Sequence, residues 1–367
     1  PPMANPLARK PRPPSAMQLA QFTRELATLV SAGIPLLQSL QAMGQGPRPE
    51  PMPSILAFLQ ERIAMGGALH AAMTDLTVFS TLYCQLVAAG ELSGNLDAML
   101  HRLAVHTEQH HQLLRKVRMA LVYPVAVLII ATTVVAVILV WVVPVFQSIF
   151  ASYGADLPWA TRMVLGLSHG LVHAGLPWAL GFSLASWLVV AQYKRRPNWQ
   201  WQFARSQLQW PLIAPLVTSA NLAIWTRCLS MLLQSGVPLL EALATVADAC
   251  PHPLFAASTR QVREAVWRGH SLSDAMRGAF PSLGDAARQT QGLFPPMLLQ
   301  MVAVGEQSGA LVSLLGKAAD AQEDQLAQQV HAFSQLLEPV MIVVLGVLVG
   351  GLVIALYLPV FQMGQVM

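Results

Sequence analysis

Charged side chains are scarce in this sequence of 367 residues. Asp, Glu, Lys and Arg make up 11% of it, hydrophobic residues make up 54%, and the mean hydropathy is +0.50. An ordinary soluble domain has about 25% charged residues, so much of the apolar content must face lipid. The small net charge of +4 gives little electrostatic support for nucleic-acid binding. The composition therefore predicts a membrane protein.

Cysteine and catalytic motifs are also scarce. Cys84, Cys228 and Cys250 show neither a CxxC nor a Cys/His spacing, which indicates neither a disulfide framework nor a zinc site. Ser168 lies in a formal GxSxG pattern, but that motif requires a strand-to-helix elbow in an α/β sheet, and here it opens an apolar run. We therefore predict no catalytic residue and no enzyme.

Three apolar runs predict membrane helices. Residues 119–143, 171–193 and 336–358 reach the roughly 20 residues that a helix needs to cross a bilayer core. Basic residues at 115–118 precede the first run and residues 194–196 follow the second, which by the positive-inside rule places both flanking regions in the cytoplasm. The predicted order is a disordered tail over 1–16, a cytoplasmic helical domain over 17–118, the first span, an external loop over 144–170, the second span, a second cytoplasmic domain over 194–335, the third span and an external tail over 359–367.

The sequence contains an internal repeat. Residues 22–40 and 225–243 match at nine of nineteen positions with an offset of 203, and a GExSG motif recurs at residues 90–94 and 305–309 with an offset of 215. Apolar residues in the first pair recur at helical spacing. No strand-like alternation of useful length occurs, so we predict an all-α fold in which each of two homologous domains leads into one membrane helix.

The repeated residues outside the apolar positions form our candidate interaction motif. A glycine followed two residues later by proline predicts a helix end, and a buried arginine needs a carboxylate or helix-end partner. We expect Arg24 and Glu91, and likewise Arg227 and Glu306, to help fix the helix packing within each domain. The full set is Arg24, Gly33, Pro35, Glu91, Gly94, Arg227, Gly236, Pro238, Glu306 and Gly309.

Two further groups of residues, histidines and prolines, are candidate sites. His101, His106, His110 and His111 precede the first span, but they lack enough partners for a metal set, and we interpret them as a solvated face. Prolines in or beside membrane helices free a backbone carbonyl and permit a kink. We therefore predict hinges at Pro124, Pro144, Pro339 and Pro359.

The repeated (F/W)TR-x-L-x-x-L-x-x-(A/S)G-(I/V)PLL, the repeated GExSG and the closing LLEPVMIVVLG and LYLPVFQ resemble the inner-membrane platform proteins of type II secretion and type IV pilus systems. The resemblance covers nearly the whole chain from about residue 18. The stretch 153–158, followed by Thr161 and Arg162, looks more like the pilus branch.

This resemblance implies a bacterial inner-membrane protein whose N-terminus is cytoplasmic and whose C-terminus is periplasmic. It implies a non-enzymatic role, in which a hexameric assembly ATPase, the transmembrane helices of pilins or pseudopilins, other inner-membrane assembly proteins and further copies of the chain are partners. In some members of the secretion branch it also implies a calcium site, which would fall on Gln38, Glu91 and Asn95. Two of these three are neutral amides, a poor donor set for calcium, so we expect no cofactor.

Two other functions remain open at this stage. Internal repeats also occur in transporters, but the two repeats here share one topology and no span has a buried charged pair. An intramembrane hydrolase would have to use Ser168. The platform function is favoured over both, with the secretion branch as the alternative to the pilus branch.

Overall fold

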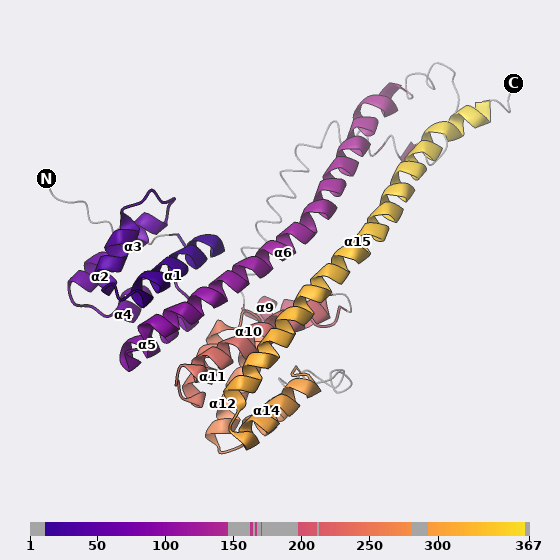
Figure 1. Ribbon diagram of the computed structural model, residues 1–367. Coiled ribbons are helices and arrows are strands. Elements are labelled where there is room, and N and C mark those ends of the chain that lie inside the picture. Colours follow the sequence, from indigo (N-terminus) through magenta and orange to yellow (C-terminus); the bar gives the residue numbers. More distant parts are fainter. Residues whose placement is uncertain are drawn as a thin grey trace. The chain divides into compact units, whose positions relative to one another are not determined.

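A computed structural model describes residues 12–145, 162–163, 166, 170, 197–210, 213–279 and 293–363. Within these ranges every regular element is a helix and there is no strand. The all-α prediction is therefore confirmed for the described residues (Figure 1). The predicted second span, most of the loop before it and Ser168 lie outside them.

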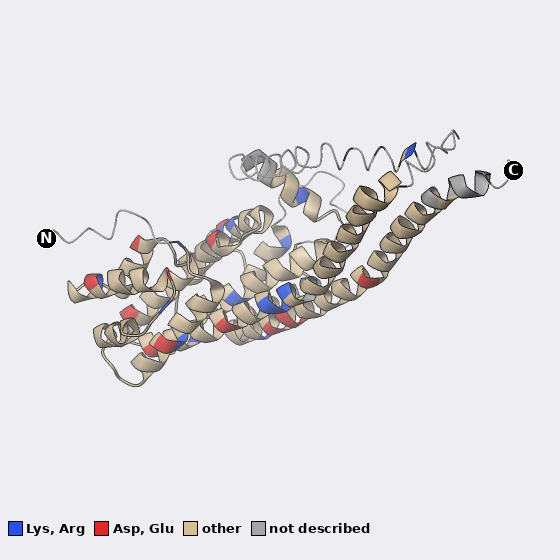
Figure 2. Ribbon diagram, turned by 90° about the horizontal axis from the view of Figure 1, so that it is seen from above, with Lys and Arg blue, Asp and Glu red and all other residues tan. Residues whose placement is uncertain are grey.

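The chain divides into two compact units. Unit 1 comprises Pro1–Lys116 and Trp201–Gln329, and unit 2 comprises Val117–Gln200 and Val330–Met367. Charged side chains are gathered in unit 1, whereas the helical segments of unit 2 are almost free of them (Figure 2). Two long helices, α6 and α15, belong partly to each unit.

The described helices form two series that correspond to the two sequence repeats. The first series is α1 (Ala16–Ser31), α2 (Leu36–Gly44), α3 (Met52–Ala64), α4 (Leu69–Leu76), α5 (Thr81–Ser93) and α6 (Leu96–Val137). After α9 (Pro197–Gln207), the second series is α10 (Ala214–Gln234), α11 (Leu239–Ala249), α12 (Pro253–Trp267), α13 (Leu272–Gly278), α14 (Pro296–Ser308) and α15 (Leu311–Met363).

In four of the six pairs of counterpart helices, the starts are separated by the repeat offsets. Helices α2 and α11, and α4 and α13, begin at positions separated by 203, while α5 and α14, and α6 and α15, begin at positions separated by 215. The offsets are the ones found in the sequence, so the duplication predicted from the repeat is present in the structure.

Local sequence signals set the ends of the first helix. Ser15 and Gln18 form a capping box at the start of α1, which satisfies two otherwise free backbone donors. At its end Gly33 has a φ of 80° and donates to the Val30 carbonyl, and Ile34 donates to that of Leu29. This is the paired bonding of a left-handed helix terminus, which a residue without a Cβ adopts without strain.

Unit 1 has one continuous hydrophobic core to which both repeats contribute. Phe22 and Leu26 of α1 are fully buried in the first repeat, and their counterparts Trp225 and Leu229 of α10 are fully buried in the second. Helix α5 packs against α10 and α11, which joins the repeats. At the same junction, Nη1 of Arg102 donates to the Gln234 carbonyl at the end of α10 over 3.1 Å.

In unit 2 the second parts of α6 and α15 lie side by side, with Leu139 and Val143 packed against Leu352. Residues 122–145 and 311–355 are long and apolar enough to cross a membrane, and only 6% of each most apolar window is buried. These segments include most of the predicted first and third spans. A helix of this length with exposed Val, Ile and Leu side chains is suited to the hydrocarbon core of a bilayer.

Helix α10 also has the length and hydropathy of a membrane span, but 61% of its most apolar window is buried. Its buried side chains include Leu222, Trp225 and Leu232, which belong to the core of unit 1. Because these side chains are covered by protein, we assign α10 to the core.

The prolines of the membrane segments do not interrupt the helices. Pro124 lies inside α6, and Pro339 and Pro359 lie inside α15. A five-residue π-helical turn, η2 (Ile138–Val142), follows α6 directly and precedes Pro144. Turns of this π-helical kind often occur at functional sites. The predicted hinges at the four prolines stay predictions.

The first glycine of each GExSG motif permits a close helix crossing. A Cβ on Gly305 would lie 2.8 Å from the Leu311 Cα, and a Cβ on Gly90 would lie 2.9 Å from the Met99 Cγ and 3.1 Å from the Leu96 Cα. The nearest atom that an added Cβ would meet belongs to the backbone at Gly305 and to a flexible side chain at Gly90. The second repeat therefore has less freedom to relax around an added Cβ.

We therefore expect Gly305→Ala to destabilise the protein by about 1–3 kcal/mol, the usual cost of overpacking, and Gly90→Ala to cost less. Gly46→Ala is the control, since nothing lies within 4 Å of that position. Thermal unfolding in detergent measures the order. An equal or smaller loss for Gly305→Ala than for Gly46→Ala would contradict the crossing as the reason for this glycine.

Candidate functional site

The glutamate of each GExSG motif binds the start of another helix. The Glu91 carboxylate accepts the backbone N–H groups of Leu69 and His70, at 2.6 and 3.0 Å. In the second repeat the Glu306 carboxylate accepts those of Leu272 and Ser273, at 2.5 and 2.9 Å. Helix N-termini carry unsatisfied donors and a partial positive charge, so a carboxylate stabilises them.

The last glycine of each motif makes the turn into the long helix. Gly94 has a φ of 71° and Gly309 a φ of 70°, in the left-handed region. Each therefore ends one helix, α5 or α14, so that α6 or α15 begins within two residues. The motif thus combines a close crossing and a sharp turn at the start of a long helix with a cap on the start of a short helix, α4 or α13.

The arginine of each repeat binds the long helix. In the first repeat, Nε and Nη2 of Arg24 bind the two carboxylate oxygens of Glu108 on α6, at 2.6 and 2.5 Å. In the second, Arg227 binds Glu323 at 2.8 Å and Asp320 at 2.5 Å, both on α15. Arg227 is the more buried of the two, with 16% of its side chain exposed against 37% for Arg24.

These contacts agree with the expectation that the repeated charges fix helix packing, and they show how. The arginine and the glutamate of each repeat act separately, because each glutamate is bound to a helix N-terminus and each arginine to a carboxylate on a long helix. Glu108 was not predicted as the partner of Arg24. Yet Glu108 and Glu323 are separated by 215 residues, so extending the repeat beyond the GExSG motif would have identified both.

The histidines on α6 differ in exposure: His101 and His110 are exposed, as a solvated face predicts, whereas His106 and His111 are half-buried. His106 and His110 stack with ring centroids 6.4 Å apart, and His106 is only partly exposed. Burial, with smaller contributions from His110 and Arg227, lowers the pKa of His106 to about 4. Burial also lowers the pKa of His110, although the Glu323 carboxylate opposes this. Both imidazoles are therefore neutral at pH 7.

The residues suggested for calcium do not fit that ion. Gln38 and Asn95 are exposed, and both oxygens of Glu91 are engaged by N–H donors, with the His70 ring 2.5 Å from one of them. Calcium would need those oxygens free. In the described part of the chain, no cluster of three or more His, Cys, Asp or Glu is suited to a metal. The expectation of no cofactor stays a prediction.

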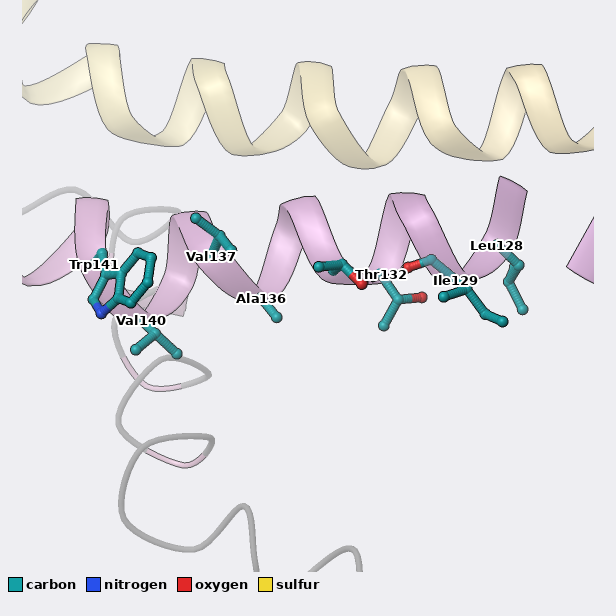
Figure 3. Close-up of a pocket in the computed structure, with 8 residues that line it drawn as sticks. Leu128, Ile129, Thr132, Ala136, Val137, Val140 and Trp141 are labelled. Carbon is teal, nitrogen blue, oxygen red and sulfur yellow. Dashed lines mark hydrogen bonds between the residues drawn. The ribbon is translucent and has the colours of Figure 1, made fainter. Parts of the chain in front are cut away.

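An apolar groove of about 520 Å³ runs along the membrane segment of α6 (Figure 3). Its described lining comes from successive turns of that helix and contains the hydroxyl groups of two threonines in an otherwise apolar surface. Thr133 donates to the Ile129 carbonyl four residues earlier. The lining residues are Leu128, Ile129, Thr132, Thr133, Ala136, Val137, Val140 and Trp141.

These features define a membrane protein built from two copies of a helical unit, each attached to a long helix by a glycine turn and an arginine ion pair. Residues 22–144 and 225–359 match the family described as type II secretion system (T2SS), protein F. The chain belongs to this family. The two matched segments coincide with the two repeats, and the resemblance found in the sequence is confirmed.

Relatives with assigned names come from both branches of the family. The chain is 36% identical over 351 residues to "Type IV pilus assembly protein PilC" of Pseudomonas aeruginosa, covering 95% of this chain and 91% of that one. It is 40% identical over 348 residues to "Type 4 fimbrial assembly protein PilC" of Pseudomonas putida, covering 94% and 84%. It is 33% identical over 354 residues to "Type II secretion system protein F" of Pseudomonas aeruginosa, covering 96% and 84%.

The family and the apolar helices together identify a multi-pass protein of the inner membrane. The family is one of structural assembly proteins and is not a known enzyme family. Ser168, the one residue weighed as a nucleophile, lies outside the described residues.

The difference in burial between the two arginines predicts a difference in their effect on stability. We expect Arg227→Ala to lower the free energy of unfolding by about 1–3 kcal/mol, between the values for exposed and buried ion pairs, because two carboxylates lose their partner. Arg24→Ala should cost less than about 1 kcal/mol. The control is Arg268→Ala, which removes an exposed pair with Glu264. Chemical unfolding in detergent would refute this ranking if Arg24→Ala proved the costlier change.

The lowered pKa of His106 predicts a loss of stability in mild acid. The folded protein holds the imidazole neutral down to about pH 4, whereas the unfolded chain takes up a proton below about pH 6.5. The unfolded state therefore binds more protons in this window, and stability falls as the pH drops from about 6.5 to 4. His106→Gln should flatten this part of the melting-temperature profile, while His270→Gln serves as a control. An unchanged slope would show that another group is responsible.

Proposed function

We propose that this protein is the inner-membrane platform of a type IV pilus machine, which couples a cytoplasmic hexameric ATPase to the insertion or extraction of pilin subunits. The observation that carries the proposal is the continuity of α6 and α15. Each begins in a helical repeat of unit 1 and runs without a break into an apolar segment of unit 2. A movement of a repeat can therefore reach the bilayer through one unbroken helix.

The contacts at the base of these helices support the same function. Arg24 and Arg227 bind the long helices from within the repeats, and the GExSG turns fix where the long helices start. A load applied to a repeat is thus passed to its long helix by ion pairs and by packing. We propose that the repeats, predicted over 17–118 and 194–335, are cytoplasmic and face the ATPase.

The groove on α6 is our proposed contact for a pilin transmembrane helix. Lipid tails are as apolar as the groove, so helix association in a membrane depends on close packing and on hydrogen bonds between helices. Ala136 permits close approach, and Thr132 and Thr133 supply hydroxyl groups on the same surface. We further propose that the C-terminal tail lies in the periplasm.

The second candidate is the platform of a type II secretion system, because a relative with that name is 33% identical over 96% of this chain. The pilus branch is favoured by the higher identities of 36% and 40% to the two pilus proteins. The residues at 153–158 that suggested the pilus branch lie outside the described residues.

The first test is a clean deletion in the native host, with surface fibres scored by electron microscopy and secreted proteins scored in the medium of the same culture. We expect fibres to be lost and secretion to continue. Loss of secretion with normal fibres would assign the chain to the secretion branch. If both persist in a strain without a second copy of the gene, the platform function is wrong.

Complementation of this strain tests the role of the continuous helix. Gln112 is exposed on α6 ahead of the membrane segment, and a proline there removes a backbone hydrogen bond and kinks or breaks the helix at a cost of about 3 kcal/mol. Gln112→Pro should leave the protein in the membrane but restore no fibres, whereas Gln112→Ala should restore them. Normal fibres with Gln112→Pro would show that helix continuity is not needed.

A further inference from the structure

Glu338 is an acidic residue that the repeat does not account for. Between Asp324 and the last residue of the sequence it is the only Asp or Glu, and its counterpart at the offset of 215 is Tyr123. Both residues precede a proline within a long helix, Pro339 in α15 and Pro124 in α6. The proline is therefore repeated and the acid is not, so the charge at residue 338 has a reason that is particular to the second repeat.

Glu338 lies at the membrane boundary of α15. Residues 339–358 are uncharged, and a helix of that length rises about 30 Å, the thickness of a bilayer core. The Glu338 side chain is exposed, and within the described part of the chain no basic side chain forms an ion pair with it. A charged side chain in or beside a membrane segment is costly without a partner and usually has a function.

Pro339 supplies a second acceptor beside this carboxylate. In an α-helix the N–H of residue 339 would bind the carbonyl of residue 335, but proline has no N–H, and α15 continues through this position. The carbonyl of the exposed Gln335 therefore lacks its helical donor. Residues 335 and 338 are neighbours on one side of the helix, and helical side chains lean toward the N-terminus, which brings the carboxylate toward this carbonyl.

These two acceptors suit an ammonium group. A protonated amine carries three diverging donors on one atom, so it can bind a carboxylate and a separate carbonyl together. The guanidinium of arginine is a planar fork that matches the two oxygens of a single carboxylate. The pair formed by Glu338 and Gln335 therefore favours an amine over a guanidinium as its partner.

The groove on α6 indicates where the amine comes from. Leu139 of α6 packs against Leu352 of α15, and the two helices run in the same direction through unit 2 (Figure 1). Glu338 is 14 residues before Leu352, and Val125 is 14 residues before Leu139, about one turn before the groove begins at Leu128. A helix lying along the groove therefore has one end at the level of Glu338.

We propose that Glu338 and the Gln335 carbonyl bind an ammonium group at the end of a partner membrane helix that lies against α6. This inference rests on the proposed function and deepens it, because it gives the chemistry of the subunit that the platform handles. Packing in the groove holds the partner helix by shape, and charge pairing across an interface fixes its register. The same pair determines which end of the partner lies beside the repeats.

Carbodiimide coupling of the full chain in membranes of the native host tests the pair. An amide bond forms between the Glu338 carboxylate and the amine, and the carbodiimide leaves as a urea that has taken one oxygen from the carboxylate and two protons from the ammonium group. We expect a product heavier than 39.7 kDa by the mass of a second membrane protein, with the amide located on Glu338 by mass spectrometry.

Two matched variants show whether the coupling depends on this carboxylate. Glu338→Gln should lose the product. Asp324→Asn should keep it, because it removes an exposed acid from the same helix ahead of the membrane segment. Three outcomes would overturn the proposal: a single phospholipid joined to Glu338, which would show that a lipid headgroup occupies the site; an amide to a lysine of the same chain; or no coupling at Glu338.

The second acceptor has its own test. Pro339→Ala restores an N–H to the Gln335 carbonyl and leaves the Glu338 carboxylate in place. The coupling yield should then fall by about tenfold, the effect of losing one hydrogen bond to a charged group. A yield equal to that of wild type would overturn the site with two acceptors.

Complementation separates this inference from the proposed function. In the deletion strain, Glu338→Gln should reach the membrane at the wild-type level but restore far fewer fibres than wild type, whereas Asp324→Asn should restore them. Full fibres with Glu338→Gln, in a strain whose deletion abolishes them, would overturn the inference and leave the platform function intact. A deletion strain that keeps its fibres would instead refute the platform function.

Discussion

A helix in a bilayer must satisfy its own backbone hydrogen bonds, because lipid offers no partners. In this chain the same internal bonding extends well outside the apolar segments, since α6 and α15 are each one helix from a repeat of unit 1 to unit 2. The two repeats need no separate joint to the membrane. The polar residues that recur in both repeats then hold each long helix, and the short helices beside it, in place.

Three different contacts recur in the two repeats, and each has a geometric reason. Glu91 and Glu306 bind helix N-termini, Arg24 and Arg227 bind the long helices, and Gly94 and Gly309 form the turns. None of these roles involves a reacting molecule, so polar residues in an apolar sequence are explained without catalysis. The repeats differ in detail, since Arg24 binds Glu108 whereas Arg227 binds both Glu323 and Asp320.

The all-α class, the duplication and the two described membrane segments could be predicted from the sequence, because each depends on a local pattern or on composition. Gly33 and Gly236 also showed where α1 and α10 end, since that turn needs a left-handed residue. The partners of Arg24 and Arg227 were not predicted, because an ion pair between helices depends on how the helices cross. The burial of His106 was missed for the same reason, since α6 alone does not show which repeat covers it.

The glycine turns before the long helices also have a consequence for how the two halves diverged after gene duplication. Any side chain at Gly94 or Gly309 would strain the backbone at a φ near 70°, and both halves have glycine there. A buried position allows more exchange, as Phe22 and Trp225 show by filling corresponding places with different rings. A change at one of these turns would therefore alter the start of a long helix, whereas one ring can replace another in the core without moving it.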